Sequence, residues 1–130
     1  MHSDIGSAHH YAIADASGRS VVVEYVDHKM VVTESPALAN HYLCEQKLNV
    51  GLKEGDDRYD RLCQRYSQTG GVMSEQQLTE AIKDVSQAQR DVFLGTAWTM
   101  VMDLKHPSVT YYSRRHFNKP FRFDLSRTQQ

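Results

Sequence analysis

The residues of this sequence best suited to chemistry lie close together, in the stretch VVTESPALANHYLC at residues 31–44. Two β-branched residues and a threonine indicate the end of a strand, and Pro36 ends it because proline has no N–H to give to a sheet ladder. A short apolar run then presents Asn40 beside His41 and Cys44. Asn40 is therefore either an ordinary turn residue or a side-chain amide that donates hydrogen bonds to a substrate.

Cys44 and His41 allow two further interpretations. A thiol and an imidazole three residues apart could form a nucleophile pair, or they could supply half of a zinc site. The nucleophile pair lacks a third group that would orient His41. The zinc site lacks its second half, because His9 and His10 are adjacent and on a strand would point to opposite faces. We expect no metal ion and no cofactor, and we expect Cys63 to belong to the core.

The period of the hydrophobic pattern predicts the elements that must position these residues. Residues 10–16 and 20–26 predict two strands joined at Gly18, where glycine supplies the positive φ of a tight hairpin. Residues 30–34 predict a third strand. Residues 44–55 contain glycines and mixed charges without a period, so they predict a connecting loop.

The pattern then becomes helical. Spacing of i, i+3, i+4 and i+7 predicts one apolar helix face, with Asp56 or Asp57 as N-cap and a Gly70-Gly71 stop. The residues on this face are Tyr59, Leu62, Cys63 and Tyr66. A second helix follows at once, so the pair predicts an αα-hairpin. Its capping box is Ser74 with Gln77, and its apolar face is Leu78, Ala81, Ile82 and Val85.

Strands return after a polar link. Alternation in AWTMVMDL places Trp98, Met100, Met102 and Leu104 on one face, and VTYYSRR and FRFDL predict two more strands. Strands, two helices and strands in this order predict an α+β fold with antiparallel sheets. We expect residues 1–130 to form a single domain, with residues 1–9 disordered or vector-derived.

Composition excludes several classes of protein. Fifteen basic and 16 acidic residues give a net charge of −1, and no Lys/Arg-rich run marks a nucleic-acid interface. No apolar stretch approaches the ~20 residues of a membrane span, and the first ten residues lack the pattern of a signal peptide. Two cysteines are too few for a disulfide scaffold, so we expect reduced thiols and a soluble, cytoplasmic protein.

Several segments taken in order resemble the C-terminal part of the choloylglycine hydrolase family. These are DASGRSVVVEY, the proline-containing segment that ends on Asn40, DDRYDRL and WTMVMDLKHPSVTYYSRR. The family comprises linear amide C–N hydrolases, such as bile salt hydrolases and penicillin V acylases, within the N-terminal nucleophile (Ntn) hydrolase superfamily. The resemblance covers almost the whole chain and implies part of an αββα sandwich with antiparallel sheets.

The resemblance also implies roles for particular residues. In such enzymes an N-terminal Cys attacks an amide carbonyl, its own α-amino group is the base, and fixed donors stabilise the oxyanion. One donor is the side-chain amide of an Asn, which here matches Asn40. The family's arginine near the nucleophile matches Arg58, with Arg61 one turn further along. Without the resemblance, Arg58 would be a solvated first-turn residue that pairs with a nearby aspartate.

The chain departs from the family at the nucleophile, because the sequence begins Met1-His2-Ser3. We therefore expect the C-terminal part of a hydrolase, whether truncated, split or processed, which is catalytically inactive alone and acts on a small-molecule N-acyl amide when complete. The alternative is a noncatalytic α+β module that self-associates. Both hypotheses predict a homo-oligomer or a missing N-terminal half, because the sheets would expose an apolar patch.

Overall fold

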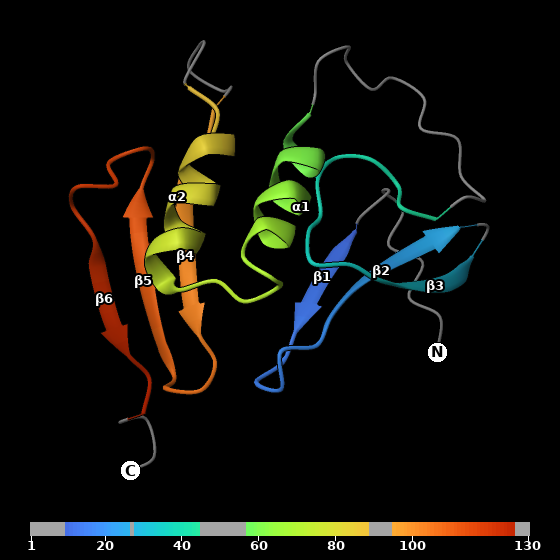
Figure 1. Cartoon of the computed structure of the whole chain (residues 1–130), viewed down its shortest axis with the longest axis horizontal. Coiled ribbons are helices and arrows are strands. Elements are labelled where there is room, and N and C mark those ends of the chain that lie inside the picture. The colour runs from blue at the N-terminus through green and yellow to red at the C-terminus, as the bar shows by residue number, and fades with distance from the viewer. Residues whose placement is uncertain (1–9, 27, 45–56, 89–94, 127–130) are drawn as a thin grey trace. The chain divides into compact units, whose positions relative to one another are not determined.

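A computed structural model describes residues 10–26, 28–44, 57–88 and 95–126 (Figure 1). The described chain falls into two compact units, residues 1–63 and 64–130. The α+β class with antiparallel sheets is confirmed. The elements in chain order are β1 (Tyr11–Ala14), β2 (Ser20–Val26), β3 (Lys29–Glu34), α1 (Arg58–Gln68), α2 (Glu75–Val85), β4 (Trp98–Asp103), β5 (Ser108–Ser113) and β6 (Phe121–Asp124).

The first unit contains a three-stranded antiparallel sheet in the order β1-β2-β3. The predicted hairpin is present, and Gly18 takes φ 90° at its turn. The Asp15 carboxylate accepts hydrogen bonds from the backbone N–H groups of Ser17 and Arg19, which fixes this turn locally. Each strand pairs with a neighbour in the sequence. The bounds of the three strands lie within a few residues of the predicted ones.

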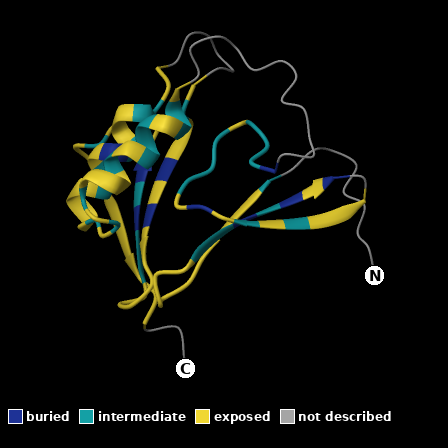
Figure 2. Ribbon diagram, turned by 45° about the vertical axis from the view of Figure 1, so that its right-hand side comes forward, coloured by how far each residue is buried: buried dark blue, intermediate teal, exposed yellow. Residues whose placement is uncertain are grey.

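The two faces of this sheet differ sharply. One face carries Val22, Glu24 and Val26 of β2, all buried. The strand register puts seven apolar residues on the opposite face, and most of them are exposed (Figure 2). We call this set the first apolar face; it comprises Tyr11, Ile13, Val21, Val23, Tyr25, Met30 and Val32.

Helix α1 follows the predicted pattern. The carbonyl of Asp57 accepts from the Arg61 N–H at 3.0 Å, which starts the helix. The helix ends as predicted, with Gly70 at φ 66° and the Gly71 N–H donating to the Tyr66 carbonyl at 3.0 Å. None of its residues is fully buried, so its apolar face is only partly covered by the described residues.

In the second unit, helix α2 covers one face of a second antiparallel sheet, ordered β4-β5-β6. The capping box is confirmed: the Gln77 N–H donates to Ser74 Oγ, and the Ser74 N–H donates to Gln77 Oε1. The carboxylate of Glu75 accepts from Thr110 Oγ1 at 3.1 Å and from the Arg122 guanidinium at 2.6 Å. The first turn of α2 is thereby joined to two strands. Among the described residues of this unit, the buried ones are Ala81, Thr99, Val101, Thr110 and Tyr112.

The opposite face of the second sheet is apolar, and it is exposed within the described residues. The register places side chains of all three strands on it. We call this set the second apolar face; it comprises Trp98, Met100, Met102, Val109, Tyr111, Phe121 and Phe123.

Some predictions fall outside the described residues. Residues 1–9 and most of the predicted loop, residues 45–56, belong to this group, as does Asp56 as an N-cap. Among the described residues, no helix combines the length and hydropathy needed to cross a bilayer.

Candidate functional site

The candidate site is the segment of residues 35–44, which lies between β3 and α1 and has no helix or strand of its own. Its first residue, Ser35, is buried. Ser35 Oγ donates to the Ala37 carbonyl at 2.8 Å and accepts from the Ala37 N–H at 3.3 Å. The same oxygen lies 3.2 Å from the hydroxyl of Tyr59 in α1. These contacts tie the start of the segment to the helix.

A ring contact ties the middle of the segment to the same helix. The rings of His41 and Tyr59 have centroids 4.9 Å apart and lie nearly perpendicular, the edge-to-face arrangement that aromatic rings favour. His41 follows Asn40 in the chain, and Tyr59 follows Arg58. The structure therefore brings together the chain neighbours of the two predicted site residues.

Asn40 itself is exposed at a bend, and Arg58 is the first residue of α1 and half-buried. Across the part of the chain that the structure describes, the side chain of Asn40 has no hydrogen-bond partner. The bend is thus not held by the Asn40 amide. Within the described ranges its two N–H donors meet no acceptor, so they are available to a bound group.

Tyr59 remains a neutral phenol at physiological pH. The hydrogen bond with Ser35 favours the phenolate, but burial, the Cys63 thiol and the charge of Asp60 outweigh it and raise the pKa of Tyr59. Tyr59 therefore keeps its O–H for hydrogen bonding with Ser35. Tyr59 thus contacts the segment at two places, Ser35 and His41.

The end of the segment is held by a carboxylate. Glu24 of β2 has no exposed surface, and its Oε1 accepts from the Leu43 N–H at 2.8 Å while its Oε2 accepts from the Cys44 N–H at 2.9 Å. Nδ1 of His10 lies 2.8 Å from Oε1, and the His10 ring lies 4.4 Å from the ring of Tyr42. Three successive residues of the segment thus meet either Glu24 or its partner His10.

These contacts keep Glu24 ionised. Burial favours the neutral carboxyl group, but the hydrogen bonds from the Leu43 and Cys44 amides and from His10 outweigh burial and lower the pKa of Glu24. A buried carboxylate is stable only when its oxygens are well supplied with donors, and here they are.

Glu24 is the residue that sequence reasoning did not select. Strand carboxylates usually lie on a solvated face, and three of them, Asp15, Glu24 and Asp103, lie within the predicted strands. Asp15 and Asp103 do serve turns, since each accepts from nearby backbone amides. The alternation of side chains along a strand could have identified Glu24. It lies two residues from Val22 and two from Val26, so it shares their buried face.

His41 contacts helix α1, and Cys44 contacts strand β2. The ring of His41 lies against Tyr59, whereas Cys44 is buried beside Glu24. Cys63 is a thiol that is half-buried rather than fully in the core. Within the described residues, no group of three or more His, Cys, Asp or Glu side chains could hold a metal ion.

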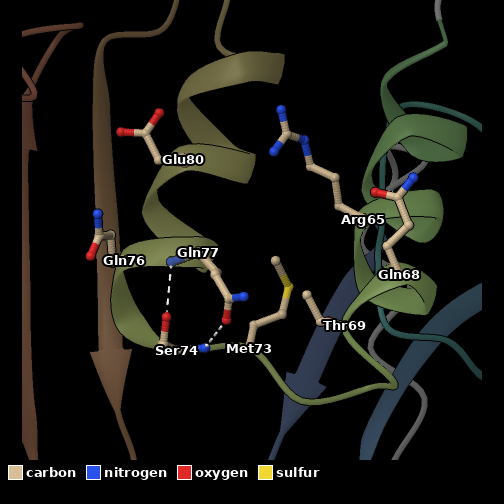
Figure 3. A pocket seen from close by; sticks show the side chains of 8 residues that line it. All are labelled: Arg65, Gln68, Thr69, Met73, Ser74, Gln76, Gln77 and Glu80. Atoms are coloured by element: carbon tan, nitrogen blue, oxygen red, sulfur yellow. Dashed lines mark hydrogen bonds between the residues drawn. The ribbon is translucent and has the colours of Figure 1, made fainter.

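The second unit has an open, polar pocket between α1 and α2, seen in Figure 3. Several of its side chains are already engaged: Arg65 pairs with Asp84 at 3.2 Å, and Ser74 and Gln77 form the capping box. No predicted site residue lies there. We therefore place the candidate site on the segment of residues 35–44.

Comparison with protein-family models, with curated proteins and with solved structures gives no match for this chain.

Proposed function

We propose that this chain is the C-terminal part of a linear amide C–N hydrolase of the choloylglycine hydrolase type, built as part of an Ntn-type αββα sandwich. In the proposed reaction an N-terminal Cys, which is not among residues 1–130, attacks the carbonyl carbon of a small N-acyl amide. Its α-amino group takes the thiol proton and passes it to the leaving amine. Water then hydrolyses the resulting thioester and releases the acid.

The proposal gives Asn40 the role of an oxyanion donor and Arg58 that of a positive charge near the reacting atoms. The observation that carries it is the ring contact between His41 and Tyr59, the chain neighbours of these two residues. The side-chain N–H groups of Asn40 have no partner among the described residues. Donors that are fixed beforehand and aimed at a developing negative charge are a large source of rate enhancement.

The second sheet adds support of a different kind. One of its faces is covered by α2, and the other is apolar and exposed within the described residues. A helix layer, a sheet and an open apolar sheet face are what one half of a helix–sheet–sheet–helix arrangement presents before its second sheet is added.

The test uses this sequence in a polypeptide that supplies an N-terminal Cys, with amine release from penicillin V and glycine-conjugated bile salts as the readout. Asn40→Ala should lower kcat by about 10²- to 10³-fold with little change in KM, because the lost donor acts in the transition state. Asn118→Ala, at an exposed turn of the second unit, is the matched control and should leave kcat unchanged.

Two results would contradict the proposal. One is full activity of the Asn40→Ala variant. The other is amine release by the 130-residue chain alone that persists when both Cys44 and Cys63 are replaced by serine, since this would require a different nucleophile.

A noncatalytic module that self-associates is the second candidate function. The two exposed apolar faces favour it, because an uncovered apolar surface of this kind is typical of interaction sites. It predicts no amidase activity in any polypeptide that contains this sequence.

A further inference from the structure

We infer that Glu24 is a positioning residue, whose buried carboxylate fixes the segment of residues 35–44, and with it Asn40, to the central strand β2. The inference rests on the proposed function only for its effect on catalysis. The contacts that carry it lie entirely within the first unit.

The segment needs such an anchor because it has no ladder of backbone hydrogen bonds. Its conformation must be set by contacts with other elements. At its end the backbone N–H groups of Leu43 and Cys44 donate to Glu24, one to each carboxylate oxygen, at 2.8 and 2.9 Å. Two successive donors bound by one carboxylate restrict both the position and the direction of the chain.

The anchor itself is fixed. β2 is paired on both sides, with β1 and with β3, so the backbone of Glu24 lies in the best-supported strand of its sheet. Nδ1 of His10 also lies 2.8 Å from Oε1, and the His10 ring contacts Tyr42 of the segment. A side chain whose conformation is fixed by its own neighbours can fix the position of another segment. A precisely arranged site requires support of this kind.

A carboxylate suits this place better than an amide of the same shape. Glutamate offers acceptors on both oxygens, whereas glutamine offers one acceptor oxygen and an NH₂ group. In a Glu24→Gln variant, the NH₂ group would face one of the donors at Leu43, Cys44 or His10. The substitution thus disrupts the paired hydrogen bonds from Leu43 and Cys44 with almost no change in side-chain volume.

The first experiment measures amide hydrogen exchange in the 130-residue chain. The Leu43 and Cys44 amides should exchange at least about 10²-fold more slowly than in an unstructured peptide, although they lie outside every helix and strand. Glu24→Gln should remove most of this protection. The control is Glu34→Gln on the adjacent strand β3, whose side chain is 78% exposed and should leave both amides protected.

Exchange of these two amides in the unsubstituted chain at unstructured-peptide rates would overturn the inference. This measurement needs no variant, so it decides the matter even if Glu24→Gln does not fold. Equal effects of Glu24→Gln and Glu34→Gln on the two amides would also overturn it.

The second experiment separates the inference from the proposed function. In a polypeptide with an N-terminal Cys, Glu24→Gln should lower kcat at least tenfold with little change in KM, and should add little once Asn40 is alanine. Lost protection with unchanged kcat would refute the positioning role but leave the amide contacts standing. Protected amides in a polypeptide that has no amidase activity would refute the proposed function but support the anchor.

Discussion

The carboxylate of Glu24 is charged although it is fully buried. Its protonation therefore depends on whether the chain is folded. Its carboxylate lies between Val22 and Val26 on the covered face of the first sheet. Backbone amides that lie 19 and 20 residues along the chain supply its hydrogen bonds, together with His10. Because those donors are available only in the folded chain, the charged form is favoured by folding.

Acidification should therefore weaken the contribution of Glu24 to stability. Its pKa in the folded chain lies below the ordinary value of 4.5, so the unfolded chain binds this proton more readily. The contribution is fully present above the ordinary pKa and is lost as pH falls through the lower folded-state pKa. We expect the difference in unfolding free energy between the unsubstituted chain and Glu24→Gln to shrink on acidification, measured by urea unfolding between about pH 7 and pH 3.

His10 and the Cys44 thiol are titratable groups that contact Glu24, so the His10 imidazole needs a control. The same comparison in a His10→Gln background removes the imidazole from the measurement. A difference between the two chains that grows as the pH falls in that background would contradict the assigned direction of the Glu24 pKa shift.

At the level of residues, the sequence allowed Asn40 and Arg58 to be put forward but not Glu24. Asn40 and Arg58 have residue types with a known use and lie in motifs of recognisable spacing. The partners of Glu24 are mostly backbone amides, which every residue except proline supplies and which leave no signature in the sequence. Only the fold shows that Leu43 and Cys44 return to β2.

At the level of elements, the helices and strands were largely predictable because they depend on local patterns. The β1-β2 hairpin, the glycine stop of α1 and the capping box of α2 are each set by residues a few positions apart. The face of the second sheet that α2 covers was not predictable. That face is the more polar one, and Glu75 of α2 meets Thr110 and Arg122 there.

The capping box of α2 predicts a measurable loss of stability on substitution. Ser74→Ala should lower the unfolding free energy by about 1 kcal/mol, because the Gln77 N–H loses its acceptor. Urea unfolding followed by circular dichroism measures this change. Ser67→Ala, at an exposed position within α1, is the matched control and should be neutral or slightly stabilising, since alanine favours helix. A Ser74→Ala variant as stable as the control would argue against the cap.

At the scale of the whole molecule, each unit has a sheet with an exposed apolar face. Monomeric proteins rarely expose contiguous apolar patches of more than a few hundred Å². Because water contact with these faces is unfavourable, we expect the isolated chain to associate into dimers or higher oligomers. Sedimentation equilibrium over a wide range of concentrations measures this, and a monomer at every concentration would contradict it.

Charged substitutions on the second apolar face test whether the chains associate through it. Met102→Lys together with Phe121→Lys, both on the second apolar face, should shift the equilibrium strongly toward monomer. Val72→Lys is the matched control, because Val72 is 78% exposed but lies in the turn before α2 rather than on a sheet. Equal effects of the control and the double substitution would exclude the second apolar face as the contact.

The second apolar face also carries its own optical probe. Trp98 is the single tryptophan of the chain, and its side chain on this face is 54% exposed. Indole emission moves to shorter wavelength when the ring leaves water, so covering the face changes the colour and the quenching of the fluorescence. Binding of any second layer, whether another copy of this chain or a different polypeptide, can therefore be followed in real time without a label.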